Sequence, residues 1–249
     1  MAKIVWIVGA SSGIGRALAL EMARDGWTVA ASARREEQLD ELAAEGPAGK
    51  IKPYPVDATD AAACAETAAK IEEQVGPITC AVFAAGTHLP QPLDDFKVED
   101  FRKLLDINVG GVVNGIAAIL PGFRARKAGH LVVVASVAGY RGLPQAPGYG
   151  ATKAALINLT ESLKFDFDHI GVKTQVVCPG FVRTPLTDKN PFSMPFLMEV
   201  EDAARDMYRG MKSNAFEVTF PKRFAYILKF LGLLPDWLYF KLVHKGTGL

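Results

Sequence analysis

The chain has little of what marks a metalloprotein, a disulfide-stabilised protein or a nucleic-acid-binding protein. It has three cysteines and four histidines in 249 residues, and none of them are spaced as metal ligands are. The odd number of cysteines argues against a disulfide framework, and Cys80 and Cys178 lie in apolar runs that indicate buried thiols. The net charge is +1 at pH 7, so nothing points to a nucleic acid as partner.

A targeting segment is also missing from the first residues. Residues 1–8 run directly into a glycine turn and are too short for a signal peptide, so we expect a cytoplasmic protein in a reducing compartment. Hydrophobic residues make up 49% of the chain and charged residues 22%, as in ordinary globular proteins. We expect one large domain at 1–221 and an apolar extension of it at 222–249.

Strand-like and helix-like segments alternate along the chain. This alternation predicts an α/β fold with a doubly wound parallel sheet and helices on both faces. The predicted strands are 4–8, 28–33, 51–56, 79–83, 131–135, 174–177 and 216–220. The predicted helices are 16–25, 36–45, 61–75, a long region at about 98–126, and one that begins near Tyr149.

The most informative stretch is 136–153, which follows the apolar run 131–135. Ser136 is expected at the carboxyl end of a strand, where open α/β sheets bind ligands. Tyr149 and Lys153 are four residues apart, so a helix places them on one face. A nearby ammonium lowers the pKa of a phenol from about 10, and a serine hydroxyl can hold a carbonyl oxygen. These side chains can therefore transfer a proton to or from a carbonyl or alcohol oxygen.

Three glycines lie between the first predicted strand and the first predicted helix. Such a turn lets the backbone approach a pyrophosphate, which then binds at the helix N-terminus. The spacing is Gly-x-x-x-Gly-x-Gly, and glycines also occur in ordinary loops, so this turn alone leaves nucleotide binding open. The residues expected to bind the cofactor here are Gly9, Ser11, Ser12, Gly13, Ile14 and Gly15.

The end of the second predicted strand favours NADP over NAD. A unit that prefers NAD usually has an acidic residue there, which binds the ribose hydroxyls. Here small residues lead to Arg34 and Arg35, and Arg34 can bind a 2′-phosphate with two hydrogen bonds. The alternative is that both arginines are solvated charges before a helix. Asp57, followed by Ala58 and Thr59, is expected either to contact the adenine or to cap the third helix.

The chain resembles the classical short-chain dehydrogenases/reductases over about residues 3–220. The glycine turn and four further positions match that family's motifs in their order and in their separation along the chain. The four positions are Asn108, Ser136, Tyr149 and Lys153. The resemblance implies a single Rossmann-like domain with a seven-stranded parallel sheet, and hydride transfer between NAD(P) and a carbonyl or alcohol. It implies that Tyr149 is the general acid/base, while Lys153 lowers its pKa and binds the nicotinamide ribose. It also implies that Ser136 orients the carbonyl and that Asn108 supports a proton relay through water.

The resemblance further implies cofactor contacts at the ends of later strands, and a homodimer or homotetramer. These contacts are expected from Ala85, Gly86, Pro179, Gly180, Val182 and Thr184. The chain departs from the family pattern at two places: Val8 stands where threonine is common, and Phe83-Ala84 stands where two asparagines are usual. These departures remove polar side chains that would stabilise the central sheet and its loop. They leave the four catalytic positions unchanged.

The segment after Thr184 is expected to close over the substrate. Its apolar side chains are Phe192, Met194, Phe196, Leu197 and Met198. They either form an adaptable lid over a hydrophobic ketone, such as a fatty-acid-derived or steroid-like one, or simply pack the loop onto the protein body.

Residues 224–243 are rich in Phe, Tyr, Leu, Ile and Trp, with basic residues around them. Pro235 divides this extension into two short helical pieces, and Lys229 and Asp236 interrupt the apolar run, so it is a poor transmembrane span. We expect it either to pack on its own or a partner subunit, which is the favoured interpretation, or to lie peripherally in a membrane interface.

The combined features predict an NADP(H)-dependent oxidoreductase with an apolar small-molecule substrate and no metal. One alternative is a non-catalytic NAD(P)-binding regulator or scaffold of the same fold. Loss of Tyr149 or Lys153 would indicate such a protein, but both residues are present. Another is a lyase or epimerase that uses NAD(P) transiently, which the chain length and the motif set argue against.

Overall fold

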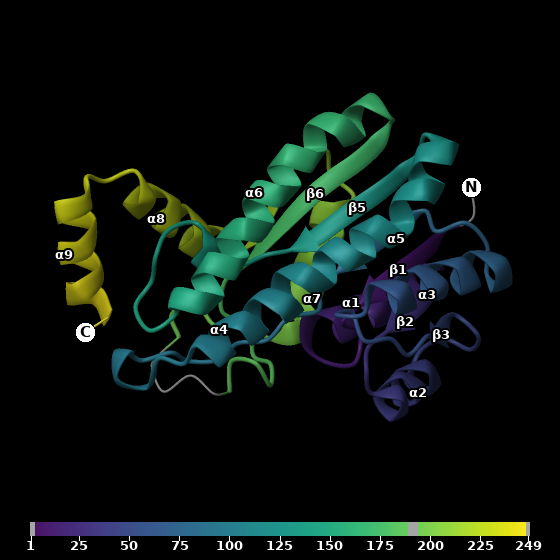
Figure 1. Ribbon diagram of the computed structural model, residues 1–249, viewed down its shortest axis with the longest axis horizontal. Coiled ribbons are helices and arrows are strands. Elements are labelled where there is room, and N and C mark those ends of the chain that lie inside the picture. The colour runs from purple at the N-terminus through teal and green to yellow at the C-terminus, as the bar shows by residue number, and fades with distance from the viewer. Residues whose placement is uncertain (1–2, 189–193, 248–249) are drawn as a thin grey trace.

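The computed structural model describes residues 3–188 and 194–247, and at its centre is a parallel sheet of seven strands (Figure 1). The strand order is β3-β2-β1-β4-β5-β6-β7, and each pair of neighbours is parallel. The strands are β1 (Ile4–Val8), β2 (Thr28–Ser32), β3 (Ile51–Pro53), β4 (Cys80–Phe83), β5 (Gly129–Val134), β6 (Val172–Pro179) and β7 (Glu217–Phe220). The predicted doubly wound α/β fold is confirmed.

Helices cover both faces of this sheet and bury an apolar layer on each. One face is covered by α1 (Gly13–Arg24), α2 (Glu36–Glu45) and α7 (Val200–Met211). The other is covered by α3 (Ala61–Gln74), α5 (Gly111–Arg126) and α6 (Pro147–His169), and α4 (Val98–Leu105) packs against α6. The extension forms α8 (Lys222–Gly232) and α9 (Asp236–Thr247), at the left of Figure 1. Sequence analysis did not predict α7.

The strand β3 ends earlier than the predicted range 51–56. The hydrogen bonds to β2 continue beyond it, since the Tyr54 N–H donates to the Ala31 carbonyl at 2.8 Å and the Val56 N–H donates to the Ala33 carbonyl at 3.0 Å. Pro53 and Pro55 alternate with these donors and have no N–H group, so they offer no donor to a further strand. β3 also lies at the edge of the sheet, where prolines are tolerated. In the interior of the sheet, β5 and β6 are longer than predicted because they pair with each other from Gly129 and Val172 onward, and β7 extends the pairing of β6 to Pro179.

Apolar packing braces the sheet at Phe83, where the family pattern has asparagine. The Phe83 ring packs edge-on against Trp6, with 5.9 Å between ring centroids, and both side chains are fully buried. Gly115 of α5 makes room for it, since a Cβ atom there would lie 2.1 Å from Cε1 of Phe83. The departure at position 83 therefore exchanges a polar brace for a dense aromatic contact.

Helices α4 and α5 join into one rod through a π-helical turn at Asp106–Gly110, which confirms the predicted helical region 98–126. Of the described residues, only this rod is long and apolar enough by composition to span a membrane, with a mean hydropathy of 1.5. It packs against α3 and α6, as a core helix does. The π turn places Asn108 toward the interior.

Candidate active site

Ser136 and the start of α6 meet at the carboxyl end of β5. Ser136 follows the strand with an extended backbone, and its hydroxyl accepts a hydrogen bond from the Ala138 N–H at 3.1 Å. A 3-10 turn at Val137–Gly139 then packs onto α6. Gly139 permits this contact, because a Cβ atom there would lie 2.6 Å from the carbonyl carbon of Lys153.

Tyr149 and Lys153 lie on one face of α6 beside Ser136, as predicted. The Lys153 Nζ is 5.6 Å from the centre of the Tyr149 ring and donates a hydrogen bond to the Val134 carbonyl at 3.0 Å. Lys153 is buried, and burial lowers the pKa of its ammonium to about 8. The structure thus brings together Tyr149 and Lys153, predicted from their spacing, and Ser136, predicted from its place at the end of a strand.

The pKa of Tyr149 differs from the sequence-based expectation. Burial raises the pKa of its hydroxyl, and a hydrogen bond with Ser136 opposes this only in part. We had expected Lys153 to lower this pKa. Removal of the phenol from water outweighs the ammonium, which lies toward the ring and bonds to the backbone of β5.

Asn108 connects the loop after β4 to the start of α6. Its side chain accepts a hydrogen bond from the Thr87 N–H at 2.7 Å and donates to the Thr87 carbonyl at 3.0 Å. It also donates to the Thr152 hydroxyl at 3.0 Å, which in turn donates to the Tyr149 carbonyl. Asn108 is fully buried and its amide is fixed by these contacts, so it holds two walls of the site together.

His88 is a further residue of this site that sequence analysis did not identify. Its ring packs edge-on against the Tyr149 ring, with 4.9 Å between the centroids. His88 lies in the loop after β4, only two residues beyond Gly86. His88 is close to Tyr149 because that loop contacts α6. No local sequence pattern predicts a contact between these two segments.

The glycine turn between β1 and α1 fits a phosphate-bearing ligand. Gly9 has a φ of 96°, and a Cβ atom there would lie 2.4 Å from the Ala85 nitrogen. At Gly15, a Cβ atom would lie 2.3 Å from the Gly9 carbonyl oxygen. The N-cap residue Ser12 makes no side-chain hydrogen bond to the first turn of α1, which leaves that turn available to an anion. Ser11 and Ile14 lie on the same turn.

Gly86 lies between the glycine turn and the catalytic residues. A Cβ atom at Gly86 would lie 3.4 Å from Asn108 Oδ1 and 3.5 Å from Lys153 Nζ. Gly86 therefore lies directly beside these two polar groups, so a cofactor bound along the glycine turn and Gly86 would lie next to them. The turn and Gly86 together fit NAD(P).

Arg34 lies beyond the end of β2 and lines an open cleft of about 740 Å³. Thr59, Arg102 and Lys103 also line it, so three basic side chains border the cleft. Arg35 instead donates a hydrogen bond to the Ser11 hydroxyl at 3.1 Å. The two arginines thus have different positions, and Arg34 is the one that borders the cleft.

Asp57 does not cap the third helix. That cap is Asp60, whose carboxylate accepts a hydrogen bond from the Ala63 N–H at 3.0 Å. Asp57 accepts hydrogen bonds from the Thr59 N–H and hydroxyl, and the Thr59 N–H is the main reason why its pKa is lowered. The neighbouring Ala58 carbonyl accepts a hydrogen bond from Asn114 of α5 at 2.9 Å.

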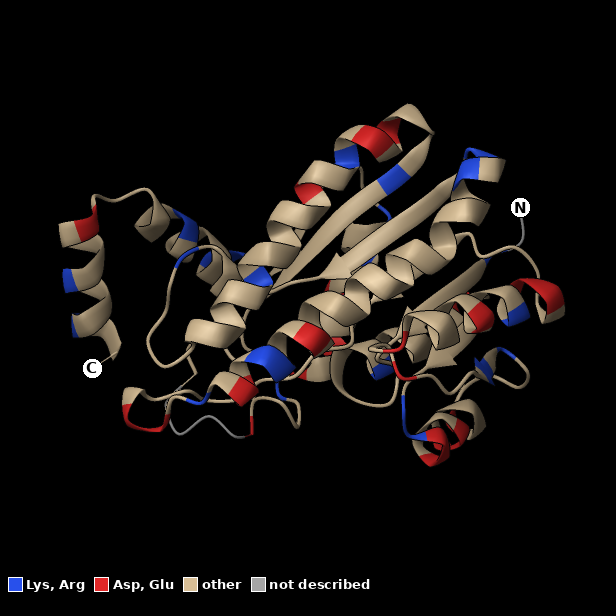
Figure 2. Cartoon of the chain, viewed as in Figure 1, with Lys and Arg blue, Asp and Glu red and all other residues tan. Residues whose placement is uncertain are grey.

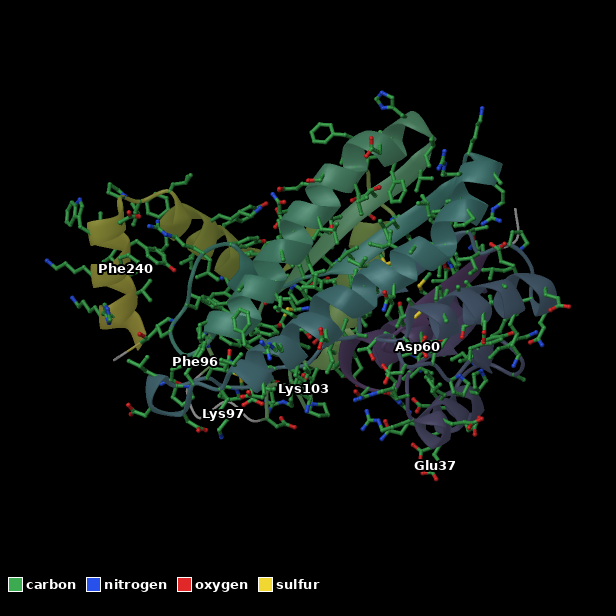
Figure 3. The ribbon with its side chains drawn as sticks, in the orientation of Figure 1. Glu37, Asp60, Phe96, Lys97, Lys103 and Phe240 are labelled. Atoms are coloured by element: carbon green, nitrogen blue, oxygen red, sulfur yellow. The ribbon has the colours of Figure 1, made fainter. Side chains whose placement is uncertain are left out.

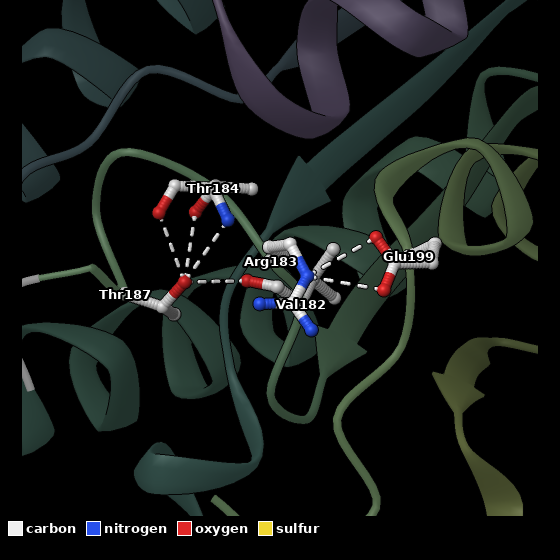
Figure 4. Close-up of polar contacts among 5 residues, drawn as sticks. All are labelled: Val182, Arg183, Thr184, Thr187 and Glu199. Carbon is white, nitrogen blue, oxygen red and sulfur yellow. Dashed lines mark hydrogen bonds and ion pairs between the residues drawn. The ribbon is translucent and has the colours of Figure 1, made fainter.

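The segment after β6 returns to the glycine turn. Thr184 lies close to the turn, since a Cβ atom at Gly13 would be 3.2 Å from its methyl group. The Thr187 hydroxyl accepts a hydrogen bond from the Thr184 N–H at 3.0 Å and lies 2.7 Å from the Val182 carbonyl (Figure 4). Arg183 pairs with Glu199 on the other side. Pro179 and Gly180 precede this segment, and the Gly180 N–H donates to the Phe220 carbonyl.

The apolar segment expected to form a lid packs on the extension. Phe181 stacks on Phe224 of α8 with 5.4 Å between centroids, and Phe196 contacts the same ring at 5.9 Å. Met198 pairs with Val182 in a single parallel bridge. Phe192 lies outside the described residues. Sequence analysis left open whether these side chains cover a substrate or pack on the protein body, and Phe196 does pack, while remaining half exposed.

Across residues 3–188 and 194–247, no three His, Cys, Asp or Glu side chains lie close enough together to hold a metal ion.

Known proteins resemble the chain in sequence and in structure. The family model described as short chain dehydrogenase matches residues 3–192. An uncharacterized oxidoreductase of Myxococcus xanthus is 39% identical over 235 residues, 94% of this chain and 93% of that protein. A 3-oxoacyl-(acyl-carrier-protein) reductase FabG of Thermotoga maritima is 35% identical over 191 residues, 76% of this chain and 78% of that protein.

A solved structure described as ElxO with NADP bound superposes with a TM-score of 0.78 and is 27% identical, covering 88% of this chain and 98% of that one. The family match spans most of the chain and agrees with the observed sheet. The protein is therefore an NAD(P)-dependent oxidoreductase that acts on CH–OH or C=O groups. It belongs to the classical short-chain dehydrogenases/reductases.

Proposed function

We propose that the protein reduces an apolar ketone to an alcohol and prefers NADPH. The observation that carries the proposal is the cluster of Ser136, Tyr149 and Lys153 at the carboxyl end of β5. Because burial raises the pKa of Tyr149, its hydroxyl stays protonated at neutral pH. A protonated phenol is the form that donates to a carbonyl oxygen, as reduction requires.

In this proposal each side chain has a distinct task. NADPH supplies the hydride when it is bound. Ser136 donates a hydrogen bond to the carbonyl oxygen and holds it beside Tyr149, which gives that oxygen its proton. Lys153 stabilises the phenolate that results, because its ammonium lies near the ring. Asn108 fixes the loop after β4 and the start of α6, and supports proton return through water and Lys153.

The preference for NADPH rests on Arg34. It borders the cleft beyond β2 together with Arg102 and Lys103, and its guanidinium can bind a 2′-phosphate with two hydrogen bonds, although Glu99 and Asp106 also line this cleft. The ElxO structure carries NADP, which supports the same choice. The other proposed cofactor contacts are Gly9, Ser11, Ser12, Gly13, Ile14, Gly15, Arg35, Asp57, Ala58, Ala85, Gly86, Pro179, Gly180, Val182 and Thr184.

The proposed substrate is a fatty-acid-derived ketone. Phe181, just after β6, and Phe196, farther along the same segment, form an aromatic cluster with Phe224 of α8. Such a cluster offers an apolar surface to an acyl chain. The Thermotoga relative is named for reduction of 3-oxoacyl groups, which makes such groups the first compounds to try. We also propose a homodimer or homotetramer through α5 and α6, which sedimentation velocity measures directly.

Paired titrations test the function. The purified protein is titrated with NADPH and NADH by fluorescence, and then assayed with acetoacetyl-CoA and longer 3-oxoacyl-CoA esters. We expect tighter binding of NADPH and ester-dependent NADPH oxidation that improves with chain length. Tighter NADH binding would overturn the cofactor preference. Cofactor binding without turnover of any ketone would favour a regulatory or scaffold protein instead.

A further inference from the structure

Helix α8 has apolar side chains on its outer face as well as on its inner one. Phe224 and Ala225 are buried against the protein body. Tyr226, Ile227 and Phe230 point away from it and are exposed, Phe230 to 64%. A surface helix normally has polar residues on its exposed face, whereas on α8 these three large apolar side chains are exposed together with Lys222 and Arg223.

Helix α9 repeats this pattern. Tyr239 is its buried residue and packs toward the loop after Ser136. Trp237 and Phe240, three residues apart and therefore on one side, are exposed, Trp237 to 70%. In the described part of the chain, fourteen large apolar side chains are exposed, and seven of them lie within 222–247. Apolar exposure is thus concentrated in the extension.

Positive charge is concentrated in the same segment. Residues 222–247 contain five Lys or Arg and one Asp, whereas the rest of the chain contains 23 basic and 26 acidic residues. The single acid, Asp236, pairs with Arg141, and Lys229 pairs with Glu217 of β7. Lys222, Arg223, Lys241 and Lys245 are exposed. Figure 2 shows blue residues on both helices and red only at the start of α9.

The extension also lies at one end of the molecule. In Figure 3, Phe240 of α9 is at the left end, and Phe96, another exposed apolar residue, lies at the same end on the loop before α4. Aromatic side chains and lysines at the protruding end of a molecule are the composition of membrane-interface segments, where rings lie at the headgroup level and ammonium groups reach the phosphates.

We propose that the outer faces of α8 and α9 bind the surface of an anionic lipid bilayer. The helices lie in the plane of the headgroups, with Trp237, Phe240 and Phe230 inserted and the lysines on lipid phosphates. A contact between two copies through the same helices is less favourable. An extension-to-extension contact would bring two basic segments together. The charge of the extension therefore favours lipid over a second copy.

Vesicle sedimentation with the full chain tests this proposal. We expect the protein to sediment with vesicles of phosphatidylcholine and phosphatidylserine, and much less with phosphatidylcholine alone. Lys241→Gln with Lys245→Gln should weaken binding on the order of tenfold or more, at about 1 kcal/mol per basic residue. Trp237→Ser with Phe240→Ser should weaken it by a similar or larger factor. The matched pair Trp237→Phe with Phe240→Leu keeps the apolar surface and should retain binding.

The fluorescence of Trp237 provides a direct measurement of contact with the vesicle. Trp6 is fully buried and Trp27 is partly buried and bonded to Tyr208, whereas Trp237 is 70% exposed on the proposed surface, so Trp237 is the tryptophan most accessible to vesicles. Its emission should shift to shorter wavelength on addition of anionic vesicles, and Trp237→Phe should lose the shift while still sedimenting. Absence of sedimentation with anionic vesicles would overturn the proposal. So would dissociation of an oligomer by the two serine substitutions, which would assign this surface to a second copy.

Discussion

The guanidinium carbon of Arg141 lies 3.8 Å from the centre of the Tyr239 ring, and so joins the loop after Ser136 to the last helix of the chain. Arg141 also donates hydrogen bonds to the carbonyls of Gly232 at 3.1 Å and Leu234 at 2.9 Å, and pairs with Asp236 at 2.5 Å. The Tyr239 hydroxyl donates to the Gly142 carbonyl at 2.6 Å. One residue earlier, Tyr140 bonds to Glu217. The extension is thus attached to a wall of the active site.

Arg141→Ala should loosen the extension. It removes hydrogen bonds to the C-terminal end of α8, the ion pair and the ring contact, with an expected loss of about 2 kcal/mol. Limited proteolysis should then cut within 222–247, and kcat/KM should fall while NADPH affinity is kept. Arg141→Lys keeps the charge near Asp236 but loses the planar contacts, and should be intermediate. A digestion pattern like that of the wild type would contradict this attachment.

Tyr149→Phe should reduce kcat by about 10²–10⁴-fold, the usual contribution of a general acid. The ring and its contact with His88 remain, so NADPH affinity should change little. Steady-state rates with a 3-oxoacyl-CoA ester and cofactor titration by fluorescence separate the two effects. A rate close to that of the wild type would show that another group donates the proton.

Arg34→Ala should weaken NADPH binding by about 10–100-fold, the range for a lost hydrogen bond to a charged group. NADH has no 2′-phosphate, so its affinity should be nearly unchanged. Arg24→Ala is the matched control, because Arg24 is exposed in the last turn of α1 and does not line the cleft. Equal losses for both cofactors would remove Arg34 from the 2′-phosphate site.

Acid should destabilise the protein through His130. Burial lowers the pKa of His130 to about 4, and repulsion from Lys173 adds to this, whereas the hydrogen bond with Gln175 opposes it. The unfolded chain binds a proton near pH 6.5 and the folded chain does not until about pH 4. Stability therefore falls as the pH drops from about 6.5 to 4, by on the order of 3 kcal/mol from this group.

Urea unfolding at pH 7 and pH 5 measures this loss. The wild type should lose more stability between the two values than His130→Gln does. A glutamine side chain cannot titrate, so the acid-dependent loss from this position disappears in the variant. His169→Gln, at the exposed end of α6, serves as control and should retain the loss. The same pH dependence in the wild type and in His130→Gln would assign the acid sensitivity to other groups.

Local patterns were sufficient for most of the fold and for the centre of the site. The order of strands and helices follows from apolar runs and turn residues. The i, i+4 spacing of Tyr149 and Lys153 defines a shared helix face in any α-helix. The predicted helical region 98–126 is also present, although the π turn at Asp106–Gly110 within it was not predicted. In each case the determining contacts lie within a few residues.

Contacts between distant segments could not be predicted in this way. His88 meets Tyr149, and Arg141 meets α8 and α9, only because separate loops converge at the carboxyl end of the sheet. The direction of the Tyr149 pKa was wrong for a related reason. The spacing of two residues gives their proximity but not the degree of burial, and here burial dominates.

The contact between Phe83 and Gly115 makes these two positions interdependent. A methyl group at 115 has no space while the Phe83 ring is present, and a small polar residue at 83 would leave a void above the glycine. An exchange at either position is then tolerated only together with a compensating exchange at the other. Homologous chains, and variants selected for stability, should therefore show paired residue choices at this point between β4 and α5.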